Sequence, residues 1–281
     1  MTDIHRPVIV GVDGSPASLG AVRWAADEAV RLRQPLQIVH ALEATEASGP
    51  APDEHELTVR AAVDARGWHP GLHVTTCTWR GGPGRVLIDQ SRHAGLVVVA
   101  SRGTGGFQAL PVGSVGEQLA AHAHCPVLVV HDAQRWADPS VTLPQQRPVV
   151  VGTDGSAHAQ HAIELAFAEA GSRHVDLIAV RAWQEPPRHW GRASRRERLA
   201  DDVQHALARE LEPWLSKHPA VSVELRSVHG AVVPVLLAEA QDALMVVLSP
   251  RGTGGFDALR LGSVTQQVLD HAPVPVLVAR R

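Results

Sequence analysis

Two glycine-rich segments of closely similar sequence stand 149 residues apart in the chain. ASRGTGGFQALPVGS occupies residues 100–114, and SPRGTGGFDALRLGS occupies residues 249–263. Glycines lack a Cβ and let a ligand approach the main chain, and successive amides in such turns form a concave site for anions. We expect each segment to bind phosphate. The alternative is that the segments serve only as connections from a strand to a helix.

Each glycine segment ends in Gly-Ser and runs into a helical pattern. Ser114 precedes Glu117 by three residues, and Ser263 precedes Gln266 by the same spacing. This spacing predicts a capping box, in which the serine side chain accepts a hydrogen bond from a main-chain amide of the first turn. A helix amino terminus aimed at a ligand adds unpaired amides and a partial positive charge, which favours a polyphosphate.

An aspartate follows the first apolar run of each half of the chain. Asp13 lies in PVIVGVDGS at residues 7–15, and Asp154 lies in PVVVGTDGS at residues 148–156. In open parallel sheets, ligands bind beyond the carboxyl ends of the strands. We therefore expect each aspartate to share a crevice with the glycine segment of its own half. An aspartate in this position also accepts amides of its own turn, and that interpretation remains open.

These duplicated motifs predict one structural unit written twice. Within the first half, helical patterns alternate with apolar or β-branched runs, and Ser15 and Pro16 suit the start of the first helix. Strands are expected at residues 8–12, 36–42, 72–79, 96–101 and 126–130. Such alternation implies an α/β fold of two tandem doubly wound domains, each Rossmann-like with a five-stranded parallel sheet.

The predicted domains cover residues 1–133 and 148–281, joined by a polar linker at 134–147 that contains prolines. The second repeat carries eight more residues between its second strand and its glycine segment than the first repeat does. We expect the excess in a surface loop around residues 184–198, a polar stretch rich in arginine and proline.

Composition and motifs exclude several classes of function. With 281 residues, 20% charged residues and a net charge of −3, the chain has no field that would attract nucleic acid or a membrane. No run of about 18 apolar residues occurs, and Cys77 and Cys125 are too few for a disulfide scaffold, so we expect a cytoplasmic protein. Lys217 is the only lysine, which excludes a P-loop ATPase. No GxGxxG follows the first strand, no nucleophilic triad has a recognisable context, and we expect no metal site among the 17 histidines.

The glycine segments resemble the ATP motif of the universal stress protein family in its tandem two-domain form, and the resemblance spans nearly the whole chain. That motif is a glycine, two residues, a glycine, nine residues, and then a glycine followed by serine or threonine. Its last three positions fall on Gly103, Gly113 and Ser114 in the first repeat and on Gly252, Gly262 and Ser263 in the second. Its first position is Ala100 in one repeat and Ser249 in the other.

The resemblance implies two domains like those of the adenine nucleotide alpha hydrolases, with ATP and Mg²⁺ in the crevice of each. Asp13 and Asp154 would lie beside the nucleotide, and main-chain groups near Ala41 and Ala182 would meet adenine. The implied role is a nucleotide-responsive regulatory module in stress or dormancy adaptation, with a possible homodimer and an unknown protein partner.

Two other interpretations remain open. Ala100 and Ser249 add a Cβ where the family motif has glycine, so the chain could be a nucleotide-free scaffold or interaction protein. It could also be a slow ATP hydrolase, with Asp13 or Asp154 orienting water or metal. No residue of the sequence is otherwise assigned a catalytic role.

Overall fold

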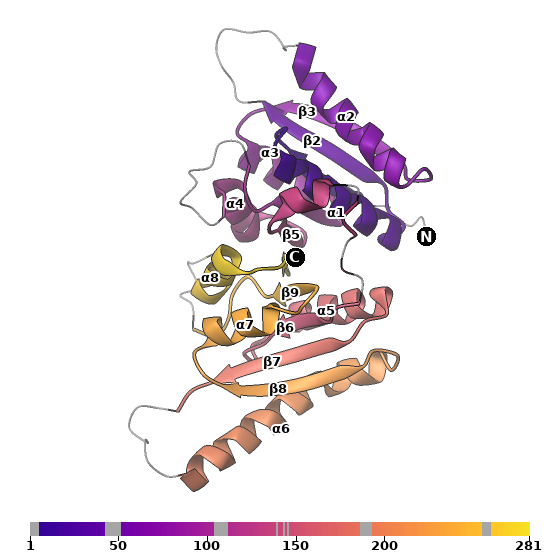
Figure 1. Ribbon diagram of the computed structural model, residues 1–281. Coiled ribbons are helices and arrows are strands. Elements are labelled where there is room, and N and C mark those ends of the chain that lie inside the picture. The colour runs from indigo at the N-terminus through magenta and orange to yellow at the C-terminus, as the bar shows by residue number, and fades with distance from the viewer. Residues whose placement is uncertain are drawn as a thin grey trace. The chain divides into compact units, whose positions relative to one another are not determined.

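The computed structural model describes residues 6–42, 52–103, 112–138, 140–142, 144, 146–185, 193–254 and 260–281, without the side chains of residues 52–55 and 193–195. The chain divides into two compact units. The first comprises Met1–Leu143 with Arg280–Arg281, and the second comprises Pro144–Ala279. Each unit is built on parallel strands with helices between them (Figure 1).

In the first unit the strands lie in the order β3-β2-β1-β4-β5, and every neighbouring pair is parallel. Helices α1 and α2 pack together, as do α3 and α4. The elements are β1 (Val8–Val12), α1 (Pro16–Leu32), β2 (Leu36–Leu42), α2 (Pro52–Trp68), β3 (Val74–Arg80), α3 (Pro83–Gln90), η1 (Ser91–His93), β4 (Leu96–Ala100), α4 (Ser114–His122), β5 (Val127–Val130) and η2 (Ala133–Ala137).

The second unit repeats this arrangement, with strand order β10-β9-β6-β7-β8 and parallel pairing throughout. Its elements are β6 (Val149–Gly152), α5 (Ala159–Arg173), β7 (Leu177–Trp183), α6 (Ala193–Lys217), β8 (Val223–His229), α7 (Val232–Ala240), β9 (Met245–Leu248), α8 (Ser263–His271) and β10 (Val276–Val278). The predicted α/β class with doubly wound parallel sheets is confirmed.

The central strands are apolar because helices cover both faces of each sheet. Every residue of β5, β6 and β9 is buried. Helix α1 begins as the sequence predicts: Pro16 is its first residue, and the Ser15 side chain accepts a hydrogen bond from the Ser18 amide at 3.1 Å. Its buried stripe includes Ala21, Trp24 and Ala25, so apolar spacing identified the face that packs on the sheet.

The predicted position of the eight extra residues in the second repeat is wrong. Nine residues separate the second strand from the next helix in both repeats, at 43–51 and at 184–192. The excess lies in α6, which has 25 residues where α2 has 17. Arg196 and Arg198 are exposed on α6, so the arginine-rich stretch extends a solvated helix face rather than a loop.

The segment expected to be a linker begins with η2, which packs on α1 of the first unit. Trp136 is 4% exposed, and its ring meets Trp24 edge-on with the centroids 6.1 Å apart. Arg23 donates a hydrogen bond to the carbonyl oxygen of Asp138 at 2.8 Å. These contacts anchor residues 133–138 to the first unit.

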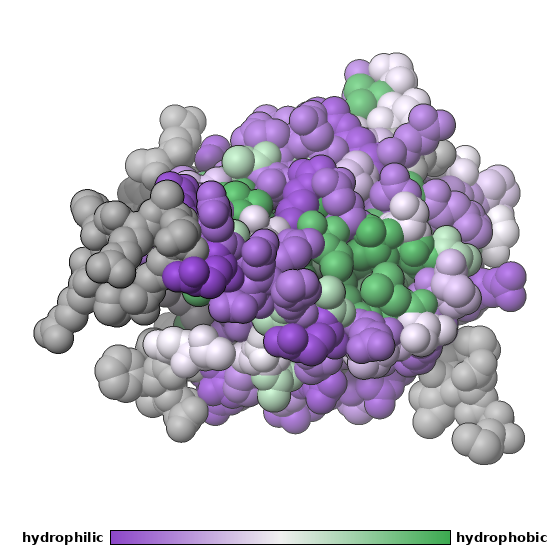
Figure 2. All heavy atoms as spheres, turned by 90° about the horizontal axis from the view of Figure 1, so that it is seen from below, coloured by the Kyte–Doolittle hydropathy of each residue, from purple (hydrophilic) through white to green (hydrophobic). Residues whose placement is uncertain are grey.

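The face drawn in Figure 2 is mostly hydrophilic, with hydrophobic residues gathered in one region. Among the described residues, no helix combines the length and the apolar character needed to cross a membrane. In each sheet the strand order reverses beside the first strand of its repeat, between β1 and β4 and between β6 and β9. Ligand sites of doubly wound folds lie outside the strand ends at this reversal.

Candidate functional site

A cavity of about 390 Å³ lies at the carboxyl ends of β1, β2 and β4, and we call it crevice one. It is bounded further by α3 and by the start of α4. All six site residues predicted in the first repeat line it: Asp13, Ala41, Ala100, Gly103, Gly113 and Ser114. The topology therefore brings together residues that are up to 101 positions apart in the chain.

The second repeat has a matching cavity of about 420 Å³, crevice two, at the carboxyl ends of β6, β7 and β9. The six site residues predicted there also line a single space: Asp154, Ala182, Ser249, Gly252, Gly262 and Ser263. Both volumes fall in the range of small-molecule pockets, roughly 300–1,000 Å³.

Each crevice has an apolar wall of aliphatic side chains in addition to its glycine loop. In crevice one this wall includes Val39, Leu87 and Val99. In crevice two it includes Val180, Val232, Leu236 and Leu248. Small-molecule sites are typically lined by apolar side chains together with a few polar groups that fix the orientation of the ligand.

The aspartates hold the main chain of their own turns. Asp13 Oδ1 accepts hydrogen bonds from the Ser15 amide at 3.0 Å and from the Ser15 hydroxyl at 2.7 Å. Asp154 Oδ1 accepts from the Ser156 amide at 3.0 Å, and its Oδ2 accepts from the Thr253 amide at 2.6 Å. The aspartates thus accept turn amides, as the alternative interpretation of the sequence allowed, and Asp154 also ties its turn to the glycine loop.

Burial and hydrogen bonding act on the pKa of Asp154 in opposite directions. Burial of the carboxylate raises the pKa, whereas the hydrogen bonds from Ser156 and Thr253 lower it. The hydrogen bonds prevail, and the pKa lies below its ordinary value. Asp154 is therefore an anion at neutral pH.

The second motif glycine is required by the aspartate that faces it. A Cβ on Gly103 would lie 2.2 Å from Asp13 Oδ2, and a Cβ on Gly252 would lie 2.5 Å from Asp154 Oδ2. Any other residue would push the carboxylate out of place. The shared part of the two motifs is thus a close contact between the strand-end aspartate and the loop.

The predicted capping boxes are wrong. Gly113 is the N-cap of α4 and Gly262 is the N-cap of α8, both with extended backbone and without a side-chain hydrogen bond. Ser114 and Ser263 are the first helical residues, one position too late for an N-cap hydroxyl to reach the amides of the first turn. Both serines are exposed, and both line their crevices.

The first motif position differs between the repeats in its hydrogen bonding. Ala100 ends β4 and has no side-chain donor. The Ser249 hydroxyl donates to the carbonyl oxygen of Arg251 at 2.7 Å, and the Thr265 hydroxyl donates to the carbonyl oxygen of Ser249 at 2.8 Å. The Ser249 hydroxyl thus donates its hydrogen bond within the loop, a contact that the sequence alone could not show.

A buried polar network lies beneath the turn of crevice two and was missed in the sequence. Arg181 Nη2 contacts Glu210 Oε2 at 2.5 Å, and the Thr153 hydroxyl donates to Glu210 Oε1 at 2.9 Å. The Arg181 and Glu210 side chains are 14% and 8% exposed. Burial raises the pKa of Glu210, against the hydrogen bond from Thr153 and the charge of Arg181. An arginine within the apolar run LIAVRAW was the signal that could have revealed the network.

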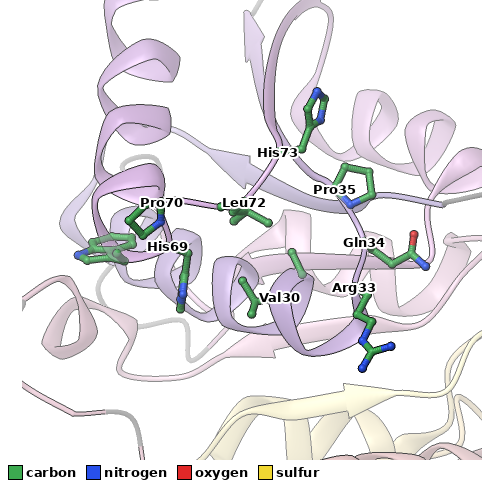
Figure 3. Close-up of a pocket in the computed structure, with 11 residues that line it drawn as sticks. Val30, Arg33, Gln34, Pro35, His69, Pro70, Leu72 and His73 are labelled. Carbon is green, nitrogen blue, oxygen red and sulfur yellow. The ribbon is translucent and has the colours of Figure 1, made fainter.

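A third cavity, of about 740 Å³, lies at the opposite end of the first unit's sheet, next to the residues that precede β2 and β3. Figure 3 shows its residues, including Val30, Pro35 and Leu72. The Arg33 and His73 side chains point in different directions and do not converge on one ligand position (Figure 3). None of the predicted site residues lines this cavity.

Comparison with known proteins decides the family. The universal stress protein family matches residues 5–131 and again residues 146–280. The chain belongs to the universal stress protein family. Universal stress protein Rv2623 of Mycobacterium tuberculosis is 34% identical over 296 residues, covering 97% of this chain and 96% of the relative.

Other relatives agree with this assignment. A universal stress protein of Mycolicibacterium smegmatis is 34% identical over 294 residues, covering 97% of this chain and 96% of the relative. The crystal structure of a universal stress protein from Archaeoglobus fulgidus matches with a TM-score of 0.66 and 19% identity, covering 99% of this chain and 97% of that one. The match to the Archaeoglobus fulgidus structure shows that the fold is shared over the whole chain.

Proposed function

We propose that both crevices bind an adenine nucleotide, ATP with Mg²⁺, and that the protein is a nucleotide-responsive regulatory module in stress or dormancy adaptation. One observation carries the proposal: in each repeat, all six residues matched to the family's ATP motif and its neighbours line one cavity. A pair of cavities of similar volume, about 390 and 420 Å³, follows the duplication of the sequence.

The two ends of each crevice suit the two ends of a nucleotide. The base would lie against the apolar wall, beside the main chain at Ala41 in the first repeat and Ala182 in the second. The phosphates would lie at the amino termini of α4 and α8, where the N-cap glycines offer no side-chain acceptor to the first-turn amides. These amides and the exposed hydroxyls of Ser114 and Ser263 are the donors for phosphate oxygens.

Each crevice could bind a magnesium ion, but it supplies few protein ligands for one. Mg²⁺ in nucleotide sites is held by one or two carboxylates together with substrate phosphates and water. Each crevice supplies one such carboxylate, Asp13 or Asp154. The ion would neutralise phosphate charge, and each aspartate would continue to hold its turn.

Regulation would follow from ordering of the loops that carry the motif. Residues 104–111 and 255–259 of these loops lie outside the described part of the chain. A ligand shifts a protein between two states only by its differential affinity for them, so contacts made to an ordered loop would favour that state. We propose that the ordered loops present a surface to a second copy of the chain or to another protein.

Calorimetric titration of the nucleotide-stripped protein with Mg-ATP tests the proposal. We expect two sites per chain, and a stoichiometry of one would mean that a single crevice is active. An absence of binding at millimolar Mg-ATP would overturn the proposal. In that case Ala100 and Ser249 would mark closed crevices, and the protein would be a nucleotide-free scaffold.

The geometry does not favour the alternative of slow ATP hydrolysis in crevice two. A general base works best when its pKa lies near the working pH, and the pKa of Asp154 is lowered by its hydrogen bonds. Asp154 directs one oxygen to the Ser156 amide and the other to the Thr253 amide. This carboxylate holds the fold of the loop.

A further inference from the structure

An exposed tryptophan stands at the edge of crevice one. The register of β2 and β3 pairs Ala41 with Trp79 (the two strands lie side by side in Figure 1). Partners in a parallel pair lie about 4.8 Å apart, and their side chains project from the same face of the sheet. Trp79 therefore stands on the same face as Ala41, which lines the crevice, although Trp79 is not itself a lining residue.

A second contact agrees with this orientation. The Gln37 side-chain amide donates to Cys77 Sγ at 3.1 Å, so residues 37 and 77 project from one face. Because side chains alternate along a strand, Ala41 and Trp79 project from that face as well. The same face carries Val39, which also lines crevice one.

Trp79 is 48% exposed, although tryptophan is one of the largest apolar side chains. A half-exposed indole has room to rotate about its first two side-chain bonds among staggered rotamers. From the strand next to Ala41, such a rotation would bring the ring toward the end of β2. The indole can thus become an outer wall of the crevice.

We propose that Trp79 is the base-stacking residue of the first repeat, its indole closing over a planar base that lies against Ala41. Aromatic side chains bind nucleic-acid bases by stacking on the π-face that every base has. This contact does not depend on the hydrogen-bond donors and acceptors of the base. The inference rests on the proposed function, because it requires a nucleotide in crevice one.

The second repeat lacks this wall. The register of β7 and β8 pairs Ala182 with Val228 instead of an aromatic residue. Val228 is half-buried and has no flat surface to offer a base. Stacking therefore distinguishes the two crevices: crevice one holds the base by an indole as well as by its apolar wall, whereas crevice two holds the base by its apolar wall alone.

Titration of the whole chain with two probes, Mg-ATP and Mg-tripolyphosphate, tests this role. Trp79→Ala should weaken one class of Mg-ATP site by about tenfold, since stacking of one base is worth about 1–3 kcal/mol. Tripolyphosphate, which has no base, should bind as tightly as it does to the wild type. Trp79→Phe should retain most of the ATP affinity, and ATP should quench indole fluorescence in the wild type more than in either variant.

A substitution in the second repeat provides the reverse experiment. Val228→Trp should tighten the other class of Mg-ATP site and leave tripolyphosphate binding unchanged. Wild-type affinity for Mg-ATP in Trp79→Ala would overturn the inference while leaving the proposed function in place, as would an equal loss of both probes. If the wild type itself binds tripolyphosphate but not Mg-ATP, the proposed function fails and the stacking role fails with it.

Discussion

Crevices one and two share their main-chain design but differ in the side chains that support it. In both repeats a glycine with positive φ follows the strand-end aspartate, at +83° for Gly14 and +81° for Gly155. A Cβ on Gly14 would meet Leu57 Cδ1 at 2.8 Å, whereas a Cβ on Gly155 would meet Arg181 Nη2 at 2.6 Å. The same turn therefore rests on an apolar side chain in one repeat and on a buried cation in the other.

The strand residue beneath the turn differs in the same way. In the first repeat His40 Nδ1 donates to the carbonyl oxygen of Val12 at 2.7 Å. In the second repeat the corresponding strand carries Arg181, paired with Glu210, which also accepts a hydrogen bond from Thr153. Arg181 Nε is buried and has no hydrogen-bond partner among the described residues. The second repeat depends on polar contacts that cost much to break.

The glycine loops differ in the same way, with polar support in the second repeat and apolar contacts in the first. In crevice two, hydroxyl groups of Ser249 and Thr265 brace the loop from within. At the position corresponding to Thr265 the first repeat has Gly116, which has no hydroxyl group. A Cβ on Gly116 would lie 3.1 Å from Val112 Cγ1. A loop that is already braced loses less freedom when a ligand binds. The duplicated backbone thus retains the ligand geometry, while each repeat supports it with different chemistry.

The largest expected effect is on the stability of the second repeat. Glu210→Ala leaves Arg181 buried without its partner, which should lower the free energy of unfolding by about 3 kcal/mol. Urea denaturation measures the loss, and hydrogen exchange should locate faster exchange in β6 and β7. If the exchange rates of these strands do not change, Glu210 does not support the turn.

A matched double variant separates the loss of the ion pair from the loss of packing. Arg181→Met combined with Glu210→Leu replaces the pair by apolar side chains of similar size and should recover most of the lost stability. The same double variant should leave exchange in β1 and β2 of the first repeat unchanged. A further loss of stability in the double variant would mean that the polar network itself stabilises the fold.

The next largest effect is a loss of ligand affinity when the second motif glycine is replaced, and we expect it in both repeats. Gly103→Ala and Gly252→Ala each place a Cβ against a carboxylate oxygen, a clash comparable to overpacking of about 1–3 kcal/mol. We expect each variant to lose about tenfold or more in Mg-ATP affinity at one site, measured by calorimetry. Gly67→Ala is the control, because Gly67 lies in α2, lines neither crevice, and has nothing within 4 Å of its added Cβ. Equal binding by all three variants would show that the aspartate contact is irrelevant to the ligand.

Much of the fold could be predicted because its signals are local and repeated. The apolar runs identified the strands, and Ser15 with Pro16 identified the start of α1. The glycine segments and aspartates converged on one edge of each sheet because parallel strands bring their carboxyl ends together. The grouping of the aspartates with the glycine segments therefore followed from sequence order and topology, whereas Ala41 and Ala182 were implied by the family resemblance.

Three features could not be predicted from local sequence patterns: the N-caps of α4 and α8, a polar contact between distant residues, and the position of the extra residues in the second repeat. The capping boxes failed because Gly113 and Gly262 took the N-cap position, a difference of one residue that sequence spacing does not resolve. The Arg181–Glu210 contact joins residues 29 positions apart on different elements, and no local pattern announces it. The excess residues of the second repeat were assigned to a loop because polar, arginine-rich sequence is typical of both loops and solvated helices.

The smallest expected effect is a pH dependence confined to the second repeat's loop. Burial raises the pKa of Asp154, and the hydrogen bonds from Ser156 and Thr253 outweigh it, so the folded-state pKa lies below the ordinary 3.8. A carboxyl group with a lowered folded pKa contributes stability that is complete above its unfolded pKa and disappears as the pH falls through the folded value. Asp154→Asn removes this contribution.

The free energy of unfolding of wild type and Asp154→Asn should therefore differ by a constant amount above about pH 5, and the difference should shrink below about pH 4. The pKa of Asp138 is lowered by its hydrogen bonds with Ser140, and that of Glu224 by its hydrogen bond with Arg226. Both groups titrate equally in the two proteins, so their contributions cancel in the difference. The charge of Asp154 helps to raise the pKa of Glu210, so the comparison is made in a Glu210→Gln background. A difference that stays constant down to pH 2 would mean that the amides of Ser156 and Thr253 do not hold an ionised Asp154. The support of the loop in crevice two would then come from the hydroxyl groups of Ser249 and Thr265 alone.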